Sequence, residues 1–250
     1  MPGRPRTGGL PLTLERGATS KQRLQIEWEH PAVVAAKGGP TQAAGALPLD
    51  EALGLLWNHD ERPLLVLRDV PGQKRDDCAL LATSIEDRAV LLTKWLHTVR
   101  LPENVLDPSH PFHRVFASVA GKDGTPQVLL FATPHAAPVV LSGAESPLQL
   151  WRCLCDVLMD RYTRDPAKAV KQWLALLEQF DGLDQRHGEV RQQLDAARAD
   201  DGAQSPRAKK LADTLARLEA ERDEVLQSEQ KARDLGLRAV PFPVARLPAK

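Results

Sequence analysis

Cysteine and aromatic residues are scarce in this sequence of 250 residues, and its net charge is zero. Its three cysteines, at positions 78, 153 and 155, are too few for a disulfide framework. Lys plus Arg equals Asp plus Glu at 33 each, so the chain lacks the overall basic field that nucleic-acid binding and anionic membrane surfaces require. No apolar run approaches the roughly 18 residues that span a bilayer. Met1-Pro-Gly-Arg-Pro-Arg is followed by no apolar segment, so we expect no signal peptide. These absences favour a cytoplasmic protein that binds neither nucleic acid nor membrane.

Short apolar segments alternate with helical ones in the first 160 residues. Pro63-Leu-Leu-Val-Leu67 is a continuous apolar run, typical of a strand that is buried on both faces. Further strands are predicted at 24–28, 127–132 and 137–141, and helices at 48–57, 78–83, 111–117 and 146–158. Over 89–101, the end of a helix is predicted to run into another strand. The last two strands are close enough to form a hairpin, whereas parallel strands need helical crossovers. The sequence therefore predicts an α/β fold with a mixed sheet covered by helices on both faces.

A seven-residue apolar repeat dominates the chain after residue 165. Trp173, Phe180, His187 and Leu194 form one row, and Leu176, Leu183, Val190 and Ala197 form the other. A breaker at 201–206 interrupts the repeat, and the same spacing resumes from Leu211. Two helices joined by a short breaker indicate an antiparallel coiled-coil hairpin, in which Leu194 faces Leu211.

These patterns divide the chain into four parts. We expect a disordered tail over 1–22, an α/β domain over 23–162, the helical hairpin over 163–237 and a Pro-rich tail over 238–250. Asp60-Glu-Arg62 is interpreted as a set of solvated loop charges.

Three features of residues 48–160 resemble the thioredoxin superfamily. The apolar strand at 63–67 leads through a loop to a predicted helix whose first turn holds Cys78, where thioredoxins carry their CxxC motif. Thr125-Pro126 precedes the strand at 127–132, as the family's cis-proline precedes a core strand. A helix also follows the hairpin, as in the family. The resemblance implies a thioredoxin-like fold with a cis peptide bond before Pro126.

The CxxC window of this chain departs from the family. It reads Arg75-Asp-Asp-Cys78, so an arginine occupies the position of the nucleophilic cysteine. Dithiol exchange needs both thiols. Asp76 and Asp77 are expected to raise the pKa of the remaining thiol. We therefore predict no dithiol chemistry, no cofactor and no metal site, with Cys78 as a small packing residue.

The leading hypothesis is a redox-inactive protein-interaction or scaffold module in a cytosolic assembly. The family's substrate groove implies partner-binding residues at Arg75, Asp76, Asp77, Thr125 and Pro126, where an extended peptide adds as a strand. The expected partner is another protein, or a second copy bound through the hairpin. Two alternatives remain open: a monothiol redox enzyme with Cys78 as its catalytic residue, and a chaperone-like holdase that uses the hairpin.

Overall fold

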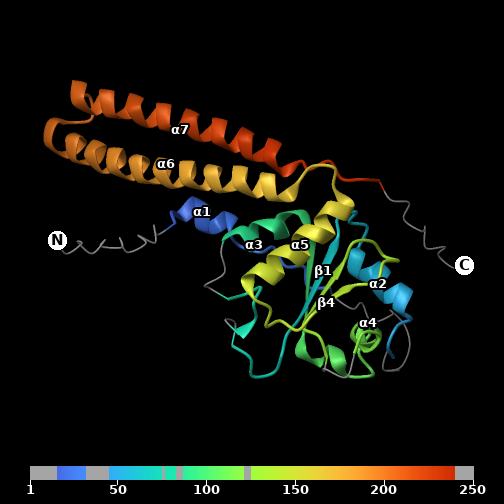
Figure 1. The fold of residues 1–250 in the computed structure, drawn as a ribbon. Coiled ribbons are helices and arrows are strands. Elements are labelled where there is room, and N and C mark those ends of the chain that lie inside the picture. The colour runs from blue at the N-terminus through green and yellow to red at the C-terminus, as the bar shows by residue number, and fades with distance from the viewer. Residues whose placement is uncertain (1–15, 32–44, 75–76, 83–86, 121–124, 240–250) are drawn as a thin grey trace, which may run out of the picture. The chain divides into compact units, whose positions relative to one another are not determined.

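The computed structural model describes residues 16–31, 45–74, 77–82, 87–120 and 125–239. The chain divides into two compact units. The smaller unit consists of Met1–Arg23 and Leu177–Asp223, and the larger of Leu24–Leu176 and Glu224–Lys250. Figure 1 shows the helices and strands along the chain.

A four-stranded mixed sheet forms the centre of the larger unit. Its strands are β1 (Leu64–Arg68), β2 (His97–Leu101), β3 (Val128–Phe131) and β4 (Val139–Leu141), in the order β2-β1-β3-β4. β1 pairs with β2 in parallel and with β3 in antiparallel, and β4 pairs with β3 in antiparallel. The α/β class and the mixed sheet predicted from the sequence are therefore confirmed.

Side chains of β1 are buried on both faces of the sheet, as its apolar run predicts. On one face, Leu64 and Val66 belong to a core cluster with residues of α2 (Leu49–Trp57) and α4 (His113–Ala117). The short 3-10 helix η3 (Glu103–Leu106) lies between β2 and α4 in the chain. Trp57 meets the Phe131 ring edge-on at 5.8 Å in this cluster.

Two other helices belong to the opposite side of the core. α5 (Pro147–Arg161) contacts α3 (Asp87–Leu92) and β3, and the 3-10 helix η2 (Thr93–Trp95) leads from α3 into β2. Ser146 and Gln149 form a capping box at the start of α5, and Pro147 occupies its first turn. This start was predicted from the sequence.

The predicted strand at 24–28 is wrong, because only Glu29 pairs with the sheet, in an isolated parallel bridge to Val99. In place of the hydrogen bonds of a β-ladder, the backbone carbonyls of residues 25 and 27 accept hydrogen bonds from side chains. The Thr98 hydroxyl donates to the Glu27 carbonyl, and the Lys94 ammonium donates to the Gln25 carbonyl at 2.7 Å.

The predicted disordered tail over 1–22 is wrong for its last residues. Ala18–Arg23 forms helix α1, in which Thr19 and Ser20 are buried. Residues 1–15 of that tail lie outside the described residues. The helix was missed because its buried side chains are small and polar, so no apolar pattern marks them.

Two long helices follow α5, at α6 (Pro166–Asp201) and α7 (Pro206–Arg233), close to the predicted bounds. Gly202, with φ +85°, lies in the turn between them, in the left-handed region that favours glycine. In the smaller unit, Leu194 and Ala197 of α6 form an apolar cluster with Ala208 of α7, against which Leu211 packs. No helix among the described residues is both long and apolar enough to cross a membrane.

Leu194→Ala should lower the free energy of unfolding by about 2–4 kcal/mol, because it leaves a cavity in this cluster. The control is Gln193→Ala, which changes the exposed neighbouring position and should alter that free energy by less than about 0.5 kcal/mol. Guanidinium denaturation followed by circular dichroism measures both. Equal stability of the two variants would show that the Leu194 cluster contributes nothing.

Candidate functional site

Cys78, the remaining cysteine of the CxxC window, is 1% exposed. Burial raises the pKa of its thiol and outweighs the backbone hydrogen bonds from Leu80 and Leu81. Residues 77–82 form turns in place of the predicted helix, with the Leu81 and Ala82 amides both donating to the Cys78 carbonyl. Ala79 N–H donates to the Gly143 carbonyl at 2.6 Å, which ties this turn to the loop before α5. The thiol is thus enclosed.

The predicted cis peptide bond before Pro126 is wrong, because no peptide bond among the described residues is cis. Arg68, at the end of β1, is 6% exposed, and its buried guanidinium contacts the backbone of Thr125 and Pro126. Its Nε donates to the Pro126 carbonyl at 3.3 Å, and its Nη2 reaches the Thr125 carbonyl at 3.5 Å. The guanidinium fixes the entry to β3, and the bond keeps the ordinary trans form of most X–Pro peptides.

Three of the five predicted partner-binding residues, Asp77, Thr125 and Pro126, lie among the described residues. Arg75 and Asp76 lie outside the described residues. The Asp77 carboxylate accepts a hydrogen bond from the Lys74 amide at 2.9 Å. Thr125 and Pro126 stand at the entry to β3, held by Arg68.

An amide pair that the sequence did not reveal joins the loop after β1 to the entry of β3. Gln127 Nε2 donates to Gln73 Oε1 at 2.6 Å, and Gln73 Nε2 donates back at 3.3 Å. Gly143 has φ +96°, and a Cβ there would lie 1.9 Å from Gln127 Oε1, so glycine is needed for this close approach. The Gln73–Gln127 pair therefore joins the loop that precedes the CxxC window to the residue that follows Pro126.

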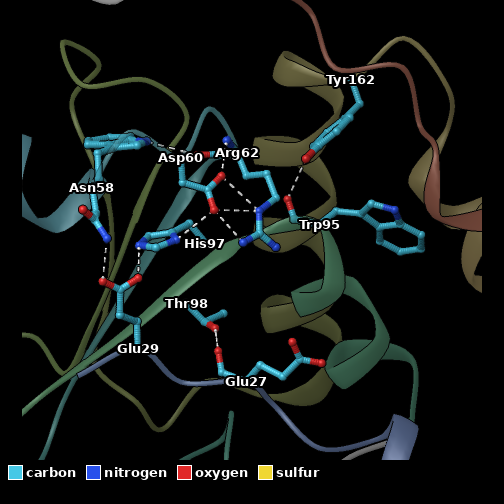
Figure 2. A network of polar contacts seen from close by, with 10 residues as sticks. Glu27, Glu29, Asn58, Asp60, Arg62, Trp95, His97, Thr98 and Tyr162 are labelled. Atoms are coloured by element: carbon cyan, nitrogen blue, oxygen red, sulfur yellow. Dashed lines mark hydrogen bonds and ion pairs between the residues drawn. The ribbon is translucent and has the colours of Figure 1, made fainter. Parts of the chain in front are cut away.

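A second polar site lies at the other end of β1 and β2 (Figure 2). His97, the first residue of β2, is 5% exposed and stands between two carboxylates. Its Nδ1 lies 3.0 Å from Asp60 Oδ2, and its Nε2 lies 3.4 Å from Glu29 Oε2. Asp60 also accepts from the Arg62 guanidinium, at 3.0 Å from Nε and 2.6 Å from Nη2. Asp60 and Arg62 are thus bonded within the fold, unlike the solvated loop charges that the sequence suggested, whereas Glu61 between them is exposed as predicted.

The surroundings of Asp60 and Tyr162 shift the pKa values of both groups away from neutral pH. Burial by itself would raise the pKa of Asp60, but hydrogen bonds from His97 and Arg62 outweigh it and hold that pKa well below its usual range. Tyr162 donates its hydroxyl to the Trp95 carbonyl at 2.8 Å, and burial raises its pKa to about 12. Neither group changes its protonation near neutral pH.

A small cavity of about 140 Å³ adjoins His97. It is lined by Glu27, Glu29, Arg62, Thr93, Lys94, Leu96, His97, Thr98 and Arg233. Many of the lining groups already have partners. Lys94 lies 3.2 Å from Glu27, and the hydroxyls of Thr93 and Thr98 donate to the backbone carbonyls of Val90 and Glu27. Among the residues described, no three His, Cys, Asp or Glu side chains gather as metal ligands. These contacts bind residues 25–30 and 58–62 to β2. We call this set of contacts the clasp.

No family model, curated protein or solved structure matches this chain.

Asp60→Asn should lower the free energy of unfolding at pH 7 by about 1–3 kcal/mol, because a neutral amide loses the charge-assisted bonds from Arg62 and His97. Asp60 has a lower pKa in the folded chain than in the unfolded one. Its stabilisation is therefore complete above about pH 4, the unfolded value, and is lost as the pH falls through the folded value.

The stability difference between Asp60→Asn and the wild type should consequently shrink between pH 7 and pH 2 in denaturant titrations. Asp156→Asn, an exposed carboxylate on α5, serves as the control and should show no comparable trend. A difference for Asp60→Asn that stays constant or grows in acid would contradict the clasp.

Proposed function

We propose that this chain is a redox-inactive, thioredoxin-like module that binds another protein within a cytosolic assembly. The observation that carries the proposal is the outer strand of the sheet. β4 pairs with β3 on one side, and no strand within the described residues pairs with its other side. Val139 and Val140 on this strand are 36% and 46% exposed. An open edge with exposed valines favours the addition of an extended segment from a partner.

The sheet order supports the thioredoxin-like part of the proposal. A parallel β1–β2 unit with α3 and η2 in its crossover is followed by the antiparallel β3–β4 pair and then α5. This succession, with the first strand at the centre, is that of the thioredoxin core. The trans peptide before Pro126 departs from the family, so we place the partner on β4 and not beside Pro126.

The enclosure of Cys78 supports redox inactivity and argues against the monothiol alternative. A reactive thiol needs access and a lowered pKa. Cys78 is 1% exposed, and burial raises its pKa. Cys153 and Cys155 lie two residues apart on α5, and all three cysteines are free thiols.

We further propose that α6 and α7 form an antiparallel coiled-coil hairpin. In the smaller unit, Leu194 and Leu211 share one apolar cluster. Arg186 of α6 also lies 3.1 Å from Glu221 of α7. An apolar seam flanked by ion pairs is the pattern of such a hairpin.

In the native chain, iodoacetamide at pH 8 should alkylate Cys153 before Cys78, because Cys153 is half-buried whereas Cys78 is enclosed. Cys78 should react about tenfold more slowly than in the denatured chain, since it must await local opening. Mass spectrometry of tryptic peptides follows each site. The same preparation should not reduce insulin with dithiothreitol as electron donor. Reaction of native Cys78 at the denatured rate would favour the monothiol enzyme instead.

A photo-crosslinking residue at position 140 should form an adduct with the partner in cells, whereas one at Leu55 should not. Leu55 is a matched control because it is 53% exposed on α2, outside β4. The partner identified from the adduct, once purified, should bind Val140→Lys about tenfold or more weakly than the wild type, because an edge lysine opposes strand addition. Equal adducts from both positions, or unchanged affinity of Val140→Lys, would rule out the β4 edge as the binding site.

A further inference from the structure

The smaller unit holds residues 16–23, which include α1, against one face of α6. Four residues of α6 make this face: Leu177, Phe180, Asp181 and Asp184. Their spacing of three and four residues puts them in one row on the helix surface. We name this row the acidic stripe and residues 16–23 the N-terminal segment.

Two carboxylates of the stripe bind the start of α1. Asp181 accepts from Arg16 Nη1 at 2.9 Å and from the Gly17 amide at 2.8 Å. Asp184 accepts from the Thr19 amide at 2.9 Å and from the Thr19 hydroxyl at 2.8 Å. The carboxylates therefore do for α1 what an N-cap residue does within its own helix. Hydrogen bonds to charged acceptors are the stronger ones in proteins.

Further contacts come from both long helices. The Ser20 hydroxyl donates to the Leu177 carbonyl of α6 at 3.1 Å, and Arg222 of α7 donates to the Thr19 hydroxyl at 3.1 Å. The Arg23 guanidinium lies 4.1 Å from the centre of the Phe180 ring, a cation–π contact. The stripe thus recognises a pattern: an arginine, a glycine, a Thr-Ser pair and a second arginine.

Gly17 is a requirement of this recognition. A Cβ at position 17 would lie 2.9 Å from Asp184 Oδ2 and 3.1 Å from Asp181 Oδ1. Both carboxylates are already held by hydrogen bonds, so a larger residue must shift Asp184 and crowd Asp181.

The N-terminal segment has the properties of a docked peptide. α1 has six residues, and isolated helices shorter than about 12 residues are marginal in water, so its order depends on the stripe. Its central side chains, Ala18, Thr19 and Ser20, are small, and its anchoring is mainly polar. Water replaces polar contacts when the segment leaves, which makes such docking reversible.

We propose that the acidic stripe is a peptide-docking site, occupied in the free chain by residues 16–23, and that a partner protein bearing the same residue pattern docks there by displacing them. The inference goes beyond the proposed function, because the stripe lies on α6 and not on β4, so each can fail without the other. The chain's own segment competes at a high effective concentration and keeps the site closed to weak partners.

The first test measures release of the segment in the full chain. Hydrogen exchange of the Gly17 and Thr19 amides, followed by NMR, should speed up about tenfold or more in Asp184→Asn, because the variant loses charge-assisted bonds. Asp195→Asn, an exposed carboxylate on α6, is the matched control and should leave both amides unchanged. Unchanged exchange in Asp184→Asn would overturn the proposal.

The second test offers the site a peptide. A fluorescent, acetylated peptide of residues 16–24 should bind saturably to the full chain carrying Gly17→Val, whose own segment is displaced. It should bind about tenfold or more weakly to the wild type, whose site is occupied, and to Gly17→Val combined with Asp184→Asn. Gly17→Val combined with Asp195→Asn should bind like Gly17→Val alone.

Fluorescence anisotropy measures the four affinities, and Thr19→Ala replaces Gly17→Val if circular dichroism shows that the latter is misfolded. Failure of the peptide to bind the opened chain would overturn the proposal. Equal affinity with and without Asp184, or for the wild type and the opened chain, would overturn it as well, since the peptide would then bind elsewhere.

Discussion

Burial of β1 on both faces is the constraint on which the larger unit depends. A five-residue strand enclosed by β2, β3 and two layers of helices has no route to water, so its side chains are apolar up to Arg68. The charges gather at its two ends. Asp60 and Arg62 meet His97 just before it, and Arg68 reaches the carbonyls of Thr125 and Pro126 after it. Each end therefore fixes a loop where the sheet meets solvent.

At both ends the polar groups are bonded within the fold. Around His97, the Asp60 carboxylate is shared by the imidazole and the Arg62 guanidinium, and the Cys78 thiol is buried. We propose that the chain works through its surfaces and not through chemistry at these two ends. The open β4 edge and the acidic stripe on α6 are two such surfaces, one apolar and one charged.

The sequence predicted those elements whose pattern is local and strong. The apolar run of β1, the Ser146-Pro147 start of α5 and the seven-residue repeat of α6 each indicate burial or a helix start directly, so they are seen without knowledge of the fold. Prediction from the sequence failed where the local structure depends on contacts between residues far apart in the chain. α1 depends on Asp181 and Asp184, more than 150 residues away in the sequence, and no local pattern marks it. Arg68 contacts the carbonyls of Thr125 and Pro126 from 57 or more positions away, and the role of Asp60 depends on His97.

The most direct measurement of the central claim is hydrogen exchange of the β4 amides in the free chain and in its complex with the crosslinked partner. If the partner adds a strand to the sheet, the amides of Val139–Leu141 gain protection on binding, while those of α2 do not. Unchanged exchange in β4, with protection gained elsewhere, would contradict the claim that this edge binds the partner.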